Sequence, residues 1–436
     1  MSEWTRKTIA ECAANEPYST QIGPFGKALT PEEYTLSGVP LLRGVNVNHG
    51  RFYDDGFVFI SEETADRLYK YESYPGDVLL VHKGTLGQIG LMPHNRKYHR
   101  YIMGNSMLRV RCDETKLIPE YLYYWLCSRE GQHYLFSRVS QVGVPQIQKP
   151  LATLREASLL VPPIDEQKSI TRILETLDTK IENLRRQNET LEKIAQTLFK
   201  HWFIDFEFPN DDGKPYKSSG GAMVASELGN IPEGWRVEKL GDYINIQHGY
   251  NFKSEDFADD GNPIVRMGNF LINGGLDFQK EKTKFFSGNI NQKFILQAND
   301  LVVALSDVTQ NGLILGNPGF IPSDNRKYLL NQRVGKVFIN NFVNKIFLYC
   351  LMKTKTYKNW VKNSANSTTV LNTSPSRIGE LLCALPLNNE LLDKLEILLK
   401  PIFFKNENNI KQIQTLIKTR DALLPKLMSG QIRVKD

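Results

Sequence analysis

Several features that mark common classes of protein are missing from this chain of 436 residues. No pair of its five cysteines has the CxxC spacing, so neither a zinc site nor a disulfide framework is indicated. No run approaches the roughly 18 apolar residues of a membrane-spanning helix. The N-terminus has no apolar signal core, which leaves the cytoplasm as the expected compartment.

Catalytic and nucleotide-binding motifs are missing as well. The phosphate-binding pattern GxxxxGK[ST] does not occur, and residues 84–90 (GTLGQIG) instead predict a turn that brings the backbone close to another group. The Asn/Asp-Pro-Pro-aromatic tetrapeptide of methyltransferases is absent, and the acidic stretch 211–214 (DDGK) lies in a glycine-rich segment that favours a solvated turn. We therefore expect no catalytic residue, no metal and no cofactor in this chain.

The composition is that of a globular protein, with 41% hydrophobic and 23% charged residues. At roughly 100–200 residues per domain, the length allows two to four domains. The net charge of +6 is too small for indiscriminate electrostatic binding to DNA. If the chain binds nucleic acid, the affinity must depend on specific contacts or on basic partner subunits.

The chain contains an internal repeat. Residues 38–43 (GVPLLR) recur as 261–266 (GNPIVR), and residues 76–80 (GDVLL) recur as 299–303 (NDLVV), both with an offset of 223. Further matches at offsets of 223 to 226 pair Asn46 with Asn269, Asn105 with Asn331, 121–123 with 347–349, and Pro162 with Pro386. An offset that changes by three residues indicates two copies of one domain, each with small insertions and deletions in its loops.

Each copy begins with about 150 residues of short β-rich runs separated by Gly, Asn and Pro, and this pattern predicts a mixed α/β domain. A helical pattern of about 40 residues follows, with Asp165 as the expected N-cap of the first helix. Its apolar positions alternate in steps of three and four, as in a heptad seam. The predicted seam comprises Ile170, Leu174, Leu177, Ile181, Leu184, Asn188, Leu191 and Leu198 in the first helix and Leu395, Leu399, Ile402, Ile413, Leu416, Leu423 and Leu427 in the second.

Two interpretations of these helices compete. Each could be an amphipathic helix that lies on its own domain, or the two could pack on each other. A helix of 40 residues is about 60 Å long, which exceeds what one small domain can cover and favours packing of helix on helix. Asn188 is then expected to fix the register, and Pro401 to kink the second helix or break its first turns.

The predicted boundaries follow from these patterns. The first domain spans residues 1–157 and the first helical region 158–208. A linker rich in Gly, Pro, Ser and Asp covers 209–230, the second domain 231–385, and the second helical region 386–436.

Polar loops at equivalent places in the two copies are the candidate binding sites. Residues 94–101 (HNRKYHRY) and 324–328 (DNRKY) mix cations with aromatic rings, and Arg and Lys neutralise phosphates. Residues 140–149 and 363–377 are rich in amides and hydroxyls, and Asn and Gln can pair with adenine through two hydrogen bonds. Such loops can also be simple solvated connections, but their recurrence in both copies favours function.

The sequence resembles the specificity subunits of Type I restriction-modification systems. The residues that carry the resemblance are 161–167 (VPPIDEQ), 202–208 (WFIDFEF), 214–216 (KPY), 234–235 (GW) and 423–430 (LLPKLMSG), in addition to the repeat. The resemblance implies an α+β fold in which two target recognition domains are each followed by a long helix, and the two helices form an antiparallel coiled coil. It implies a non-catalytic, DNA-binding subunit. Because recognition domains vary within the family, the base preference of a relative cannot be assigned to this chain.

The resemblance also implies partners. Two modification subunits with S-adenosylmethionine would methylate adenine, and two motor-nuclease subunits would use ATP and Mg²⁺. Because the copies differ in their loops, the DNA target should be bipartite and asymmetric, with a spacer set by helix length. Two alternatives stay open: a DNA-binding or coiled-coil adaptor that works without a methyltransferase, and a fused nuclease or methyltransferase, against which the missing motifs argue.

We assign Lys and Arg mainly to phosphate, and the amides and hydroxyls mainly to base edges. The candidate DNA contacts are Lys83, Thr85, Arg96, Lys97, Arg100, Gln141, Gln146, Gln148 and Lys149 in the first copy, and Ser306, Thr309, Gln310, Arg326, Lys327, Asn366, Thr368, Thr369, Asn372, Ser376 and Arg377 in the second.

Overall fold

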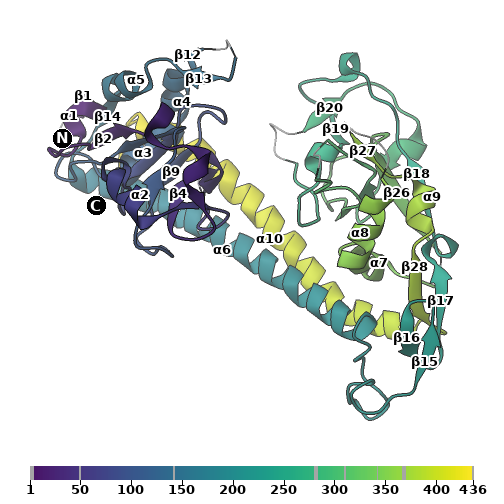
Figure 1. Cartoon of the computed structure of the whole chain (residues 1–436). Coiled ribbons are helices and arrows are strands. Elements are labelled where there is room, and N and C mark those ends of the chain that lie inside the picture. The colour runs from purple at the N-terminus through teal and green to yellow at the C-terminus, as the bar shows by residue number, and fades with distance from the viewer. Residues whose placement is uncertain are drawn as a thin grey trace. The chain divides into compact units, whose positions relative to one another are not determined.

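The computed structural model describes residues 4–48, 51–140, 143–278, 283–308, 311–340, 342–365 and 370–434. The chain folds as two compact units, one of residues Met1–Asn183 with Gln412–Asp436 and the other of Leu184–Lys411. Each unit contains one copy of the repeat together with half of each of two long helices (Figure 1). We call the copies the first domain (residues 4–161) and the second domain (residues 223–386).

The first domain is built on two four-stranded sheets. The strands follow the orders β2-β11-β8-β9 and β10-β4-β7-β3, and β10 pairs with β4 in parallel. All four residues of β8 are buried, as expected for a strand covered on both faces. The bounds are β2 Thr20–Ile22, β3 Tyr34–Thr35, β4 Val39–Leu42, β7 Val58–Ile60, β8 Val78–Val81, β9 Ile89–Leu91, β10 Ile102–Met103 and β11 Met107–Val110.

The second domain repeats the order of the first sheet and of three strands of the second sheet, but the fourth strand of that sheet lies at the opposite edge. Its sheets follow the orders β18-β26-β22-β24 and β20-β19-β25-β21, and β19 pairs with β25 in parallel, as β4 does with β10. The predicted tandem repeat of mixed domains is therefore confirmed. The bounds are β18 Ile244–His248, β19 Asn262–Val265, β20 Lys284–Phe286, β21 Ile295–Leu296, β22 Leu301–Ala304, β24 Pro318–Phe320, β25 Tyr328–Leu330 and β26 Val334–Ile339.

Each domain is closed by a pair of antiparallel strands from its two ends. In the first domain β1 (Thr5–Thr8) pairs with β14 (Ser158–Val161), and in the second β17 (Trp235–Lys239) pairs with β28 (Leu382–Pro386). Short helices complete the domains: α1 Ile9–Cys12, α2 Glu62–Arg67, α3 Pro119–Cys127, α4 Arg129–Phe136 and α5 Pro150–Glu156 in the first, and α7 Lys345–Leu351, α8 Lys355–Asn363 and α9 Pro375–Gly379 in the second.

The long helices are α6 (Ile164–Phe203) and α10 (Glu390–Met428). In the first unit, Ile170 and Leu174 near the start of α6 share a core with Leu427 near the end of α10. In the second unit, Phe199 near the end of α6 shares a core with Leu395 near the start of α10. Because the helices meet in opposite order, they run antiparallel, and the interpretation in which each helix lies only on its own domain is wrong.

The predicted seam positions lie on the inner side of this pair. Each of the fifteen is buried or half-buried, and Ile170, Leu174, Leu395 and Leu399 are fully buried. The buried stripe is wider than a heptad seam, since Phe199 and Leu424 are also buried in the cores that the helices share with the two domains. A helix that packs on both a helix and a domain needs a broader apolar face.

Three details differ from the sequence-based expectations. Helix α10 runs without a break through Pro401, so the expected interruption is wrong. The carbonyl of Ile397 loses its helical donor there, but Ile397 is 71% exposed and water can bond it. Asp165 is not the N-cap, because α6 already begins at Ile164. The segment expected to be a linker, residues 209–230, includes most of a hairpin of β15 (Met223–Ser226) and β16 (Gly229–Pro232).

No helix among the described residues is long and apolar enough to cross a membrane.

Candidate nucleic-acid interface

Two of the candidate loops of the first domain are joined by their backbones. One loop connects β8 to β9, and the other follows α4. Lys83 and Gln146 face each other in an antiparallel bridge, Gly84 N donates to Pro145 O over 3.0 Å, and Ile147 N donates to His82 O over 2.9 Å. The side chains of Lys83 and Gln146 are exposed. The structure therefore brings two predicted contact residues, 63 positions apart in sequence, to one site.

The glycine-rich segment predicted to form a turn lies in this loop. Gly84 and Gly87 have φ values of +87° and +77°, which L-residues with side chains rarely adopt. A Cβ atom at Gly87 would lie 2.6 Å from Gln132 Oε1, so the turn packs closely on α4. Thr85, between the two glycines, is held exposed at the tip.

The second domain has the same arrangement with different side chains. Strand β23 (Ser306–Asp307) pairs with β27 (Leu371–Asn372), so that Ser306 lies opposite Asn372 as Lys83 lies opposite Gln146. Ser306 Oγ donates to Asn372 Oδ1 over 2.6 Å, and Asn372 Nδ2 donates to Val370 O over 2.8 Å. The amide of the exposed Asn372 is thus fixed in one orientation. We call these two pairs of joined loops the paired-loop sites.

The remaining amide, hydroxyl and basic candidates flank the paired-loop sites. Gln148 and Lys149 are exposed directly after β13 (Gln146–Ile147), and Lys149, with φ of +41°, precedes α5. In the second domain Ser376 Oγ lies 2.8 Å from Ser374 Oγ, and Arg377 Nη1 forms an ion pair with Glu380 Oε2 at 2.9 Å. Six candidates lie outside the described residues: Gln141, Thr309, Gln310, Asn366, Thr368 and Thr369.

The basic-aromatic segments lie elsewhere. Residues 92–101 follow β9, so they leave the β8–β9 hairpin at the end opposite to the paired-loop site. Arg96 Nη1 donates to Ser73 O over 3.3 Å, and Lys97 Nζ lies 5.5 Å from the centroid of the Tyr98 ring. In the second domain the segment 324–328 has the same place after β24, and Lys327 is exposed.

Two of these cations are neutralised within the chain. Arg100 bonds three carboxylates, those of Glu72, Asp66 and Glu62, and these hydrogen bonds, that from Glu72 above all, raise the pKa of the guanidinium. Arg326 forms a 2.8 Å ion pair with Asp324. A cation that already has carboxylate partners gains less from a phosphate. The sequence could not reveal the ion pairs of Arg100, because its partners lie 28 to 38 residues away.

Each domain is anchored to a long helix by a buried tyrosine. In the first unit Tyr124 on α3 donates to Asp178 Oδ2 over 2.8 Å, and Arg420 of α10 donates to Asp178 Oδ1 over 2.8 Å. In the second unit Tyr349 on α7 donates to Glu192 Oε2 over 3.3 Å. Burial is the main reason why the pKa of both hydroxyls is raised, and the hydroxyls therefore stay protonated and act as donors.

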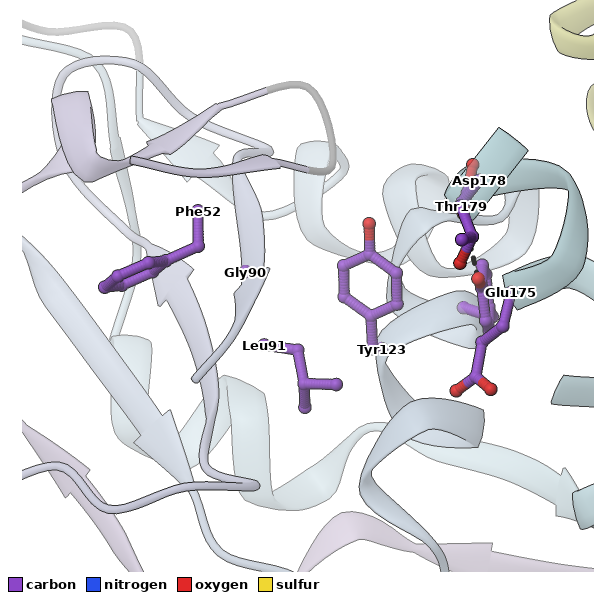
Figure 2. Close-up of a pocket in the computed structure, with 8 residues that line it drawn as sticks. Phe52, Gly90, Leu91, Tyr123, Glu175, Asp178 and Thr179 are labelled. Atoms are coloured by element: carbon purple, nitrogen blue, oxygen red, sulfur yellow. Dashed lines mark hydrogen bonds between the residues drawn. The ribbon is translucent and has the colours of Figure 1, made fainter. Parts of the chain in front are cut away.

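A pocket of about 170 Å³ opens beside the first anchor, lined by side chains from the first domain and α6 (Figure 2). Phe52, Leu91 and Tyr123 form its domain side, and Glu175, Asp178 and Thr179 form its helix side. Burial raises the pKa of Glu175, and the carboxylates of Glu120 and Asp178 add to the effect. In the residues that the structure describes, no three His, Cys, Asp or Glu side chains are grouped to hold a metal ion.

The candidate contacts predicted from the sequence did not include Arg43 and Arg266, although Arg43 lies next to the first paired-loop site. A Cβ atom at Gly44, which follows Arg43, would lie 3.0 Å from Thr85 Oγ1. Arg43 and its counterpart Arg266 belong to the repeated segments 38–43 and 261–266. The repeat was therefore the signal that could have identified them as candidates.

Comparisons with known proteins agree with this architecture. The family model described as "Type I restriction modification DNA specificity domain" matches residues 34–193 and 232–414, once in each copy of the repeat. The MjaIX specificity subunit of a Type I restriction enzyme from Methanocaldococcus jannaschii is 28% identical over 375 residues, which cover 83% of this chain and 78% of that protein. The MjaVIII specificity subunit of the same organism is 27% identical over 365 residues, with 83% and 80% covered.

A solved structure has a similar fold. The S subunit of a Type I restriction-modification system from M. genitalium superposes with a TM-score of 0.53 at 18% identity, covering 98% of this chain and 96% of that one.

Proposed function

This chain belongs to the Type I restriction-modification DNA specificity family, and on that basis we propose that it selects an asymmetric, bipartite DNA target for a restriction-modification complex. Each domain recognises one half-site through its paired-loop site. In this proposal the chain contributes DNA specificity, and the subunits that it binds contribute the catalytic groups.

One observation carries the proposal of two unlike half-sites. Lys83 and Gln146 occupy in the first domain the backbone positions that Ser306 and Asn372 occupy in the second. Lys83 offers an exposed cation, whereas its counterpart Ser306 is buried and donates its hydroxyl to Asn372, so the two sites present different groups beside the exposed amides of Gln146 and Asn372. Equivalent scaffolds with different side chains select different bases, so the target has two different halves.

The long helices act as a spacer. The antiparallel pair of α6 and α10 supports this role, because both helices pack with the domains in stable cores. A connection of fixed helix length would set the number of unread base pairs between the half-sites, as dimer geometry does in other DNA-binding proteins.

The proposed partners follow from the family. Two modification subunits, which use S-adenosylmethionine, dock on the chain and methylate adenine in the target. Two motor-nuclease subunits, which use ATP and Mg²⁺, join them for cleavage. The cytoplasm remains the expected compartment.

Methylome sequencing of cells that express this chain with its modification subunits tests the proposal. The expected motif has two different half-sites separated by an unspecified spacer, and it disappears when this chain is omitted. A continuous or palindromic motif would contradict the proposed asymmetric, bipartite target. Failure of the chain to co-purify with a methyltransferase subunit would instead support an adaptor that works alone.

A further inference from the structure

A repeated Arg-x-x-Asn motif lies beside each paired-loop site. In the first domain, Asn46 Oδ1 accepts from Arg43 N over 3.0 Å. In the second, Asn269 Oδ1 accepts from Arg266 N over 2.9 Å. Both asparagines are buried, and each arginine follows directly on the strand, β4 or β19, that precedes it. The asparagine thus fixes the backbone from which the arginine side chain extends.

Arg266 is held in an unusual electrostatic environment. It is half-buried, and burial, followed by the nearby charge of Arg333, lowers the pKa of its guanidinium. In the described part of the chain neither Arg266 nor Arg333 has a carboxylate partner, although Arg266 lies 5.0 Å from the centroid of the Phe257 ring. A partly desolvated cation that lies near a second cation, without a carboxylate partner, is stabilised when an anion binds to it.

Arg333 adjoins the loops assigned to DNA, and Arg266 is close enough to Arg333 for its guanidinium to be affected by that charge. Arg333 O accepts from Leu305 N over 3.0 Å, and Leu305 precedes Ser306 of the second paired-loop site. Leu305 O in turn accepts from Thr373 N over 2.9 Å, next to Asn372. DNA whose bases contact the exposed Asn372 would therefore bring its backbone close to Arg333, and through it to Arg266.

Arg43 has the corresponding place in the first domain. Its side chain packs against the backbone near Gly104, where a Cβ atom would lie 3.6 Å from Arg43 Cγ. Nη2 donates to Gly56 O over 3.0 Å, but the buried Nε has no partner among the described residues. An arginine that bonds a carbonyl with one nitrogen keeps its other donors and its full charge for an anion.

We propose that Arg43 and Arg266 are equivalent phosphate anchors, one in each recognition domain, and that Arg333 assists Arg266 in holding a phosphate of the DNA backbone. This inference rests on the proposed function. Guanidinium groups fit phosphate oxygens with two parallel hydrogen bonds, and contacts of this kind position the protein on the duplex without reading sequence. The different bases are then read by the paired-loop sites from a common docking geometry.

The test uses the full chain assembled with its modification subunits and a duplex that carries its methylome-defined target. Dissociation constants are measured over a series of KCl concentrations for Arg266→Ala, Arg333→Ala and Arg266→Lys. We expect each alanine variant to weaken binding about tenfold and to reduce the slope of log K against log [salt] by about one. Arg266→Lys, which keeps the charge, should keep the slope.

Several controls make the outcome specific. Lys239→Ala removes an exposed positive charge at the end of β17 and should leave both quantities unchanged. The same loss should occur on a duplex with scrambled half-sites, since a phosphate contact is independent of sequence. Thermal unfolding monitors folding, and Arg333→Ala provides a second variant if Arg266→Ala does not fold.

Unchanged binding and salt slope in both alanine variants would overturn the anchor while leaving the proposed function intact. A loss confined to the target duplex would mean that Arg266 contacts a base instead. Loss of the modification subunits from the complex would mean that the arginines bind protein, which also overturns the proposal. Failure of the unmutated complex to distinguish target from scrambled duplex would contradict the proposed function itself.

Discussion

The side-chain amide of Asn409 on α10 donates a hydrogen bond to Asn188 Oδ1 on α6, 2.9 Å away. Asn409 is fully buried, and its Nδ2 also lies 3.3 Å from Gln187 Oε1. A buried polar pair between two helices penalises every alignment in which the two amides do not meet. Asn188 thus has the environment expected of a residue that fixes the register.

Replacing one of these asparagines should be costly. Asn188→Leu leaves the buried Asn409 amide without its 2.9 Å acceptor, and we expect the free energy of unfolding to fall by about 1–3 kcal/mol. The double variant Asn188→Leu with Asn409→Leu should recover stability but allow other registers. Calorimetry measures the stability, and a cysteine pair across the helices reports the register. A double variant that keeps a single register would contradict the assigned role.

Glu175 should reduce stability at neutral pH. Its pKa is raised by burial, so the folded protein holds the proton more tightly than the unfolded chain. The stability that it contributes is therefore lost as pH rises from the unfolded value, about 4.5, through the folded pKa. Glu175→Gln should raise the melting temperature at pH 7 and have little effect below pH 4. Glu114→Gln, in the same unit but outside the pocket, is the control and should change neither.

The spacer should respond to helix length. One heptad inserted into each long helix, after Asn183 in α6 and after Lys411 in α10, keeps the seam in phase and adds about 10 Å. At about 3.4 Å per base pair, the spacer of the methylated motif should grow by about three base pairs while both half-sites stay the same. A motif with its original spacer would exclude the helices as the determinant of spacing.

Substitutions in the two paired-loop sites should alter different half-sites. Asn372→Ala removes an amide held by Ser306, so we expect discrimination at one position of the second half-site to fall by about 1–3 kcal/mol, with the first half-site unaffected. Gln146→Ala is the matched variant and should have the reciprocal effect. Methylation of a library with randomised targets measures both. Equal loss at the two half-sites would argue against separate recognition by the two domains.

Arg100→Ala should destabilise the first domain. The Glu72 side chain, 11% exposed, would lose its ion pair with the guanidinium, and an unpaired carboxylate in that position costs about 1–3 kcal/mol. Chemical denaturation measures the loss. Lys97→Ala, in the same loop, is the comparison, because the Lys97 ammonium has only an aromatic contact in the described structure. Similar stability of both variants would mean that Arg100 is free to contact DNA.

The fold was predictable where the signal is local or repeated. The steps of three and four in α6 need no knowledge of the partner helix, and the repeated segments identify equivalent strands directly. The anchor of Tyr124, Asp178 and Arg420 was not predictable, because it joins residues 54 and 242 positions apart and depends on antiparallel packing. The pairing of Arg100 depends on distant carboxylates in the same way, whereas the partners of Arg326 and Arg377 lie within three residues of them.

Because β1 pairs with β14, and β17 with β28, the chain enters and leaves each domain through adjacent strands. Two residues separate β14 from the start of α6, and three separate β28 from the start of α10. A domain bounded in this way is a cassette, since exchanging everything between its paired end strands leaves the helix that follows in place. Recombination at these two strands would change the half-site that the domain recognises while leaving the long helices unchanged.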